Sequence, residues 1–125
     1  MAYNVTIDFA SKELSGKDKV MLKDLTNATP LERCVDGADS FVIRPDFYAL
    51  LSVHNDKAKN NTDYKVCIIM DVQGNKFKTG SESFISAFTS IMEDMADCDE
   101  AWELSVYGLP SKNYAGKNFL TCSVI

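Results

Sequence analysis

Only one segment of this 125-residue chain has the apolar spacing of an amphipathic helix, and this restricts the fold more than any other feature. Within residues 84–95, apolar side chains recur mainly at intervals of three and four, which places them on one stripe of a helix: Phe84, Phe88, Ile91, Met92 and Met95. Thr79 and Glu82 have the spacing of a capping box, in which two side chains satisfy free backbone amides at a helix start. The sequence therefore predicts one helix that begins near Thr79 and ends near Asp97.

Most other apolar segments are short and alternate with polar residues, which is typical of half-buried strands. Tyr3–Phe9 is the clearest example. Pro45 predicts a break or bulge within Phe41–Val53, because proline cannot donate to a strand ladder. Gln73-Gly74 is a turn signal between two hairpin strands. The predicted strands are residues 3–9, 19–23, 41–53, 64–72, 75–78, 102–107 and 118–125, with irregular chain at 26–37, 55–63 and 108–116.

The order of these elements is strands, a hairpin, one helix and a final hairpin, without a repeat or a linker. Residues 1–125 are therefore expected to form a single domain. The same order occurs in the OB-fold, a partly open β-barrel whose helix lies between its third and fourth strands. The sequence predicts a mainly β, OB-like barrel of about five to six strands, with one amphipathic helix before the last two. An α+β sandwich is the alternative.

The sequence carries no signal for a membrane or for secretion. Its longest apolar runs have about five residues, against the roughly 20 that cross a bilayer, and residues 1–6 lack the basic and apolar stretches of a secretory signal. The four cysteines are more than twenty residues apart, so reduced thiols are expected rather than a zinc site or a redox pair. We expect a soluble protein of the cytoplasm.

The net charge of −5 argues against a nucleic-acid partner until its distribution is considered. The segment from Glu82 to Glu103 contains seven acidic residues and no basic residue. The rest of the chain contains 13 basic and 11 acidic residues, a balance of +2. A basic groove can therefore still exist outside the acidic segment.

Short motifs at the turns and element boundaries are spread over nearly the whole chain: Leu14-Ser15-Gly16, Val35-Asp36-Gly37, Asp71-Val72-Gln73-Gly74, Lys78-Thr79-Gly80-Ser81 and residues 110–117. Together they resemble the pattern of bacteriophage single-stranded-DNA-binding proteins, especially those of protein-primed Bacillus phages. The resemblance implies an OB-type fold and sequence-independent binding that protects replication or recombination intermediates in a bacterial host cell. It leaves open self-association and contacts with replication or recombination proteins.

Binding of a single strand needs aromatic rings on which bases stack and cations that follow the phosphates. The alternation of the last two strands predicts that Phe119 and Tyr107 face outward, opposite to core residues. Tyr48 is expected to be exposed for the same reason, and Lys76 and Lys78 share a face opposite Phe77. The candidate nucleic-acid-binding residues are Arg44, Tyr48, Tyr64, Lys65, Lys76, Lys78, Tyr107, Lys112, Tyr114, Lys117 and Phe119.

Catalytic and cofactor sites have little support in the sequence. His54 is the only histidine, and the scattered glycines do not form a phosphate-cradling loop. The acidic residues between 97 and 103 lack the ordered spacing of a calcium loop. We expect neither enzyme activity, nor a metal, nor a cofactor.

Two hypotheses from different functional classes remain. The first is sequence-independent binding of single-stranded DNA. The second is a protein-binding module or inhibitor from a mobile element, whose acidic helix region mimics nucleic acid against a basic partner. Position discriminates between them, because a mimic needs its carboxylates on the contact face, whereas a DNA-binding protein keeps them away from its groove.

Overall fold

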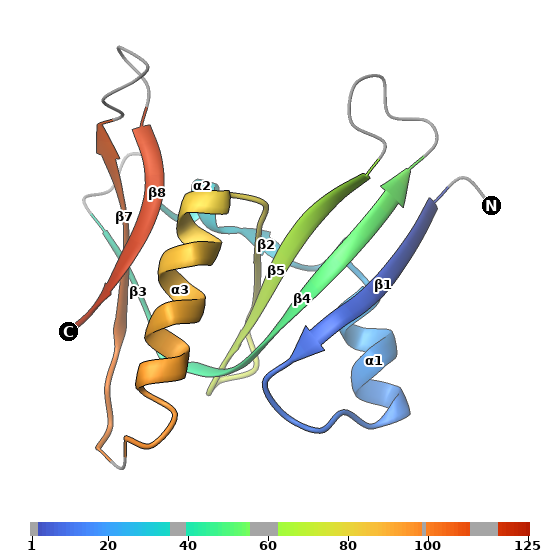
Figure 1. The fold of residues 1–125 in the computed structure, drawn as a ribbon, viewed down its shortest axis with the longest axis horizontal. Helices are drawn as coiled ribbons and strands as arrows, with labels where there is room; N and C mark the ends of the chain where they lie inside the picture. Colours follow the sequence, from blue (N-terminus) through green and yellow to red (C-terminus); the bar gives the residue numbers. More distant parts are fainter. Residues whose placement is uncertain (1–2, 36–39, 56–62, 99, 111–117) are drawn as a thin grey trace.

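The computed structural model describes residues 3–35, 40–55, 63–98, 100–110 and 118–125. In these ranges the chain forms eight strands and three helices (Figure 1). In chain order, the elements are β1 (Tyr3–Ala10), α1 (Gly16–Lys23), β2 (Thr29–Pro30), α2 (Leu31–Val35), β3 (Phe41–Ile43), β4 (Pro45–Asn55), β5 (Asp63–Asp71), β6 (Lys76–Thr79), α3 (Glu82–Asp94), β7 (Leu104–Pro110) and β8 (Asn118–Val124). None of these helices is long and apolar enough to cross a membrane.

The strands form two sheets, and the chain passes from one sheet to the other at Arg44. The large sheet has the order β1-β4-β5-β6-β2, and the small sheet has the order β3-β7-β8. Neighbouring strands are antiparallel, except that β2 runs parallel to β6. β3 ends at Ile43 and β4 begins at Pro45, with a register shift before Phe47. The predicted break at Pro45 is therefore confirmed, and it allows one long segment to contribute to both sheets.

The prediction of a mainly β fold is confirmed, but the described strands do not close into one barrel. Closure would require β6 to pair with β8. The edge of β6 is instead occupied by β2, where Thr29 pairs with Phe77 and Pro30 pairs with Lys78. The two sheets consequently remain separate, with α3 packed against β8 (Figure 1). The predicted single helix is also wrong, because α1 and α2 form before β3.

The large sheet is covered on both faces, and each face has its own hydrophobic core. The first core lies between this sheet, α3 and the small sheet, and its residues include Tyr48, Cys67, Ile69, Phe77, Phe84, Phe88, Leu104 and Cys122. The second core lies on the opposite face, and its residues include Leu22, Leu25, Phe47, Leu51, Ile68 and Met70. The predicted apolar stripe of α3 is confirmed at Phe84 and Phe88, which are fully buried.

The predicted strand at residues 19–23 is wrong, because these residues belong to α1. Ser15 caps this helix: its hydroxyl accepts the backbone N–H of Asp18, whose carboxylate accepts the backbone N–H of Ser15. This reciprocal capping box was a sequence signal for a helix start. The strand was expected to pair back on residues 3–9 after a turn at Gly16, but in the helix Leu22 is fully buried and Val20 is largely exposed. Residues 26–37, which were predicted to be irregular, contain β2 and α2.

The main helix begins two residues later than the capping pattern predicted. Ser81 is the N-cap of α3, and its hydroxyl accepts the backbone N–H of Phe84. Thr79 lies in β6, where its hydroxyl donates to the carboxylate of Glu32 and accepts the backbone N–H of Ser81. The helix ends at Asp94, before the predicted Asp97. Thr79 therefore connects α2 to the start of α3 instead of capping the helix itself.

The buried thiols make a testable prediction about chemical reactivity. Burial raises the pKa of Cys67 to about 12 and that of Cys122 to about 11, whereas Cys98 is exposed. Because the thiolate is the reactive form, these pKa values lower the reactive fraction at neutral pH about a thousandfold for Cys67 and about a hundredfold for Cys122, relative to an ordinary thiol. Ellman's reagent should therefore modify Cys98 rapidly, and Cys67 and Cys122 only after denaturation. Modification of all three at similar rates in the folded protein would contradict this core.

Candidate nucleic-acid interface

Two of the chain's connections leave the sheets on the same side of the molecule, one on the right and one on the left of the view in Figure 1. β4 ends and β5 begins at the top of the view in Figure 1, and β7 ends and β8 begins there as well, with α3 between the two pairs. Residues 56–62 join the first pair and residues 111–117 join the second. Three predicted site residues, Lys112, Tyr114 and Lys117, belong to the second connection and lie outside the described residues. We call this part of the molecule the connection end.

Tyr64 and Lys65, at the start of β5, lie directly beside the first connection. The Tyr64 ring is 38% exposed, and the Lys65 side chain is also largely exposed. The Lys65 ammonium donates to the Ser52 hydroxyl and, over 3.0 Å, to the carboxylate of Asp8. The hydroxyl of Ser52 also donates to Asp8, and this bond, followed by the bond from Lys65, lowers the pKa of the Asp8 carboxyl. Asp8 therefore stays ionised and anchors a polar network across three strands.

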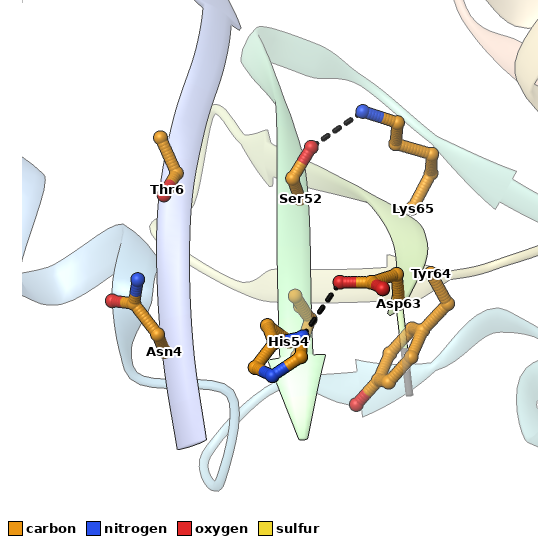
Figure 2. A pocket seen from close by; sticks show the side chains of 8 residues that line it. Asn4, Thr6, Ser52, His54, Asp63, Tyr64 and Lys65 are labelled. Atoms are coloured by element: carbon orange, nitrogen blue, oxygen red, sulfur yellow. Dashed lines mark hydrogen bonds and ion pairs between the residues drawn. The ribbon is translucent and has the colours of Figure 1, made fainter. Parts of the chain in front are cut away.

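This network borders a pocket of about 390 Å³ (Figure 2). Ser52 has the parity of Tyr48, so the pocket lies on the sheet face that α3 covers farther along β4. The pocket is lined by Asn4, Thr6, Ser52, Val53, His54, Asp63, Tyr64 and Lys65. Antiparallel register creates it, since Asn4, His54 and Asp63 form one row and Thr6, Ser52 and Lys65 the next. In the first row, Nδ1 of His54 lies 2.7 Å from Oδ1 of Asp63. The pocket thus offers both hydrogen-bond donors and acceptors.

The Tyr64 ring also borders a second, smaller pocket, on the opposite face of the large sheet. This pocket measures about 210 Å³ and includes Pro30, Val66, Lys78 and Gly80. Tyr64 thus contributes to the lining of both pockets, the first lined mainly by polar residues and the second by apolar residues and Lys78.

The second exposed ring lies beside the other connection. Phe119 faces outward from the small sheet as its parity predicted, and it is 38% exposed. It pairs with Leu109, which is similarly exposed. Tyr107 lies on the same face but is half-buried, and its hydroxyl lies 2.6 Å from the hydroxyl oxygen of Ser123. The outer face of the small sheet therefore presents a phenyl ring near the connection and hydroxyl groups farther along.

Other predicted site residues are placed elsewhere. The prediction that Tyr48 is exposed is wrong: it is 5% exposed, with its ring 5.1 Å from that of Phe88, because α3 covers this face of β4. Arg44 lies between β3 and β4, away from the connection end (Figure 1). Its guanidinium forms an ion pair of 3.2 Å with Glu103. Arg44 and Tyr48 therefore do not join the exposed rings in one site.

Lys76 and Lys78 share a face opposite Phe77, as predicted, but both ammonium groups bind backbone. Nζ of Lys76 donates to the carbonyl oxygens of Met21 and Asp24, each over 2.7 Å. Nζ of Lys78 donates to the carbonyl oxygen of Leu25 over 3.1 Å. The exposed position expected for Lys76 is wrong, because this side chain is only 7% exposed beneath the end of α1. Desolvation there lowers its pKa.

Replacing Lys76 with methionine should therefore affect folding rather than binding. The stem would keep its packing, but two carbonyl oxygens at the end of α1 would lose their donor. We expect the free energy of unfolding to fall by about 1 to 3 kcal/mol, measured by urea denaturation, with unchanged DNA affinity. Lys19→Met on the exposed surface of α1 is the matched control and should leave stability within about 0.5 kcal/mol. Equal stability of the two variants would contradict the assigned contacts.

Sequence reasoning missed the polar network of β1, β4 and β5. It considered His54 a residue without a role, and it did not single out Asp8, Ser52 or Asp63. Each of these side chains is unremarkable in its own segment. They meet only through cross-strand register, which joins residues 44 positions apart in the case of Asp8 and Ser52.

Two of the three acidic residues of α3, Glu93 and Asp94, lie far from the connection end, whereas Glu82 is exposed in the first turn at the other end of the helix. Glu93 and Asp94 are exposed at the C-terminal end of α3, at the bottom of the view in Figure 1.

No protein-family model, curated protein or solved structure gives a significant match to the chain. The functional argument therefore rests on the geometry and chemistry of the residues themselves.

Proposed function

We propose that this chain binds single-stranded DNA without sequence preference, at the connection end. The observation that carries the proposal is the position of Tyr64 and Phe119. Each is an exposed aromatic ring, and each lies beside one of the two connections that leave the sheets at this end. Exposed rings near basic segments are the two components that sequence-tolerant binding of single strands requires.

The strand order supports the same proposal. The long segment β3–β4 is followed by β5, β6, α3, β7 and β8, which is the strand, strand, strand, helix, strand, strand order of an OB-fold. In that fold, the connections after the first and fourth strands border the oligonucleotide. Their counterparts here are residues 56–62 and 111–117. The elements β1 to α2 would then be an N-terminal addition, and β2 would explain why the barrel stays open.

The charges are compatible with this placement. Lys65 lies at the connection end, and the sequences of the two connections contain Lys57, Lys59, Lys112 and Lys117, against the carboxylates of Asp56 and of Asp63 at the start of β5. Residues 111–117 contain no acidic residue. At the start of α3, Glu82 is nearer to this site, whereas Glu93 and Asp94 lie at the opposite end, where they would not repel a bound strand at short range. The alternative, a nucleic-acid mimic, remains a prediction, and no described contact favours it.

Photochemical cross-linking can locate the proposed site directly. Oligo-dT that carries 5-iodouracil should form adducts with rings on which its bases stack, and peptide mass spectrometry would identify them. We expect adducts on the peptides that contain Tyr64 and Phe119. Trp102 lies toward the opposite end, two residues before β7 begins, and is the internal control. Adducts restricted to Trp102 would place the DNA elsewhere, and no adducts at saturating DNA would remove the support for stacking.

Lysines of the second connection should act through charge alone. Lys112→Ala and Lys117→Ala should each reduce the slope of log affinity against log salt by about 0.7, the single-strand value for one phosphate contact. Lys19→Ala, on α1, is the control and should leave the slope unchanged. Fluorescence titration with oligo-dT at several salt concentrations measures all three. Parental slopes for Lys112→Ala and Lys117→Ala would show that this connection does not contact phosphate.

A further inference from the structure

β1 is an edge strand of the large sheet whose outer side is open. It pairs with β4 on one side, and Figure 1 shows no other described element along its other side. An open edge presents unpaired N–H and C=O groups that a further strand can complete, and natural edges are often blunted by lysine, proline or a bulge. Residues 3–7 contain neither lysine nor proline, and the register shift in β1 leaves only Asp8, after Ile7, without a Cα partner in β4.

We infer that β1 pairs antiparallel with β1 of a second copy, with Thr6 on the two-fold axis. In this register, Thr6 faces Thr6 of the second copy, Val5 faces its Ile7, and Asn4 faces its Asp8. A symmetric interface requires such self-complementarity, since every contact occurs twice. The polar residues would lie on one face of the joined sheet, and Val5 and Ile7 would meet on the other, beside the second core.

The side chains of Asn4 and Asp8 select this register. Oδ2 of Asp8 accepts the bonds from Ser52 and Lys65. Within the described part of the chain, Oδ1 of Asp8 and the side-chain amide of Asn4 have no hydrogen-bond partner, and both residues are exposed. The Asn4 amide can therefore donate to Oδ1 of Asp8 in the second copy, and symmetry repeats the bond. A slip of two residues would place Thr6 against Asp8 and lose both bonds.

Pairing through β1 would also join the two polar pockets. Asn4 and Thr6 form the β1 wall of the 390 Å³ pocket, so the two copies of the pocket would adjoin across the axis. If the proposed function is correct, one DNA strand can then run across both copies. This last step rests on the proposed function, whereas the pairing itself does not require DNA.

Charge reversal at the axis provides a sharp test, by analytical ultracentrifugation without DNA. The parent protein at about 10 µM should sediment at twice the 13.9 kDa mass of one chain. Thr6→Lys and Thr6→Glu should each shift this mass toward the monomer, because like charges would face each other. An equimolar mixture of the two variants should restore the dimer. Thr121→Lys, on β8, is the control and should remain dimeric.

The mixture keeps the test informative even if a variant is less stable, because a folding defect would not be repaired by mixing. A monomeric parent protein at these concentrations would overturn the inference. Variants that stay dimeric both alone and in the mixture would show that any dimer uses another surface. DNA titration is independent of this result: a monomer that binds oligo-dT would reject the pairing and retain the proposed function.

Discussion

Replacing Phe88 with alanine is expected to lower the free energy of unfolding by about 3 to 5 kcal/mol. Phe88 is fully buried in the first core. Its ring lies 5.4 Å from that of Phe84 and 5.1 Å from that of Tyr48, so it joins α3 to the large sheet. Truncation would leave a cavity that the two sheets cannot fill without moving. Urea denaturation measures the effect.

Phe119→Ala is the matched control, because it removes the same atoms from a partly exposed position. It should lower the free energy of unfolding by less than about 1.5 kcal/mol. If the two substitutions cost the same, α3 would not pack between the sheets as described. An unchanged stability of Phe88→Ala alone would lead to the same conclusion.

The double variant Tyr64→Ala/Phe119→Ala is expected to weaken oligo-dT binding by at least about 30-fold. Each base stacked on an aromatic ring contributes about 1 to 3 kcal/mol, so the loss of two rings removes at least about 2 kcal/mol. The slope of log affinity against log salt should remain near the parental value, because stacking releases no counterions. Fluorescence titration at several salt concentrations measures both quantities.

Phe9→Ala is the matched control for this loss, because its ring is 47% exposed but lies near the end of β1 that is remote from the connections. Its DNA affinity should equal that of the parent. Glu93→Lys/Asp94→Lys should leave binding unchanged or slightly stronger, because only the long-range field changes. A 30-fold loss in the Phe9 variant, or parental affinity in the double variant, would contradict the proposed site.

The sequence predicted well those elements whose pattern is local. The β5–β6 hairpin was anticipated around Gln73-Gly74, where Gly74 has a φ of 88°, a conformation that glycine adopts without strain. The stripe of α3 and the parity of β8 were also anticipated. Both depend only on residues close in sequence, because side chains share a face every 3.6 residues in a helix and every 2 residues in a strand.

The errors concern contacts between distant segments. Parity correctly separated Tyr48 from Phe47, but it could not show that both faces of β4 are covered. Lys76 was expected in solvent because parity could not show that the end of α1 covers this side chain. The closed barrel was predicted wrongly because of one strand pairing. β2 has only two residues, too few for a periodic signal, yet it occupies the edge of β6 and keeps the barrel open.

The predicted site was recovered only in part for a related reason. Sequence reasoning identified exposed rings and basic residues by type, and Tyr64, Lys65 and Phe119 are indeed exposed beside the connections. It could not show that Arg44 is at the other end, paired with Glu103, because that requires the register of β3 with β7. The polar pocket likewise depends on the pairing of three strands.

Titration of the parent protein with fluorescent oligo-dT tests the proposed function most directly. The account predicts saturable binding at about 50 mM salt, and a log-linear loss of affinity as the salt concentration rises. Duplex DNA of equal length should bind more weakly, because its bases are not free to stack on Tyr64 and Phe119. Absence of binding to oligo-dT at about 50 mM salt would contradict the account, since phosphate contacts are strongest when salt is low.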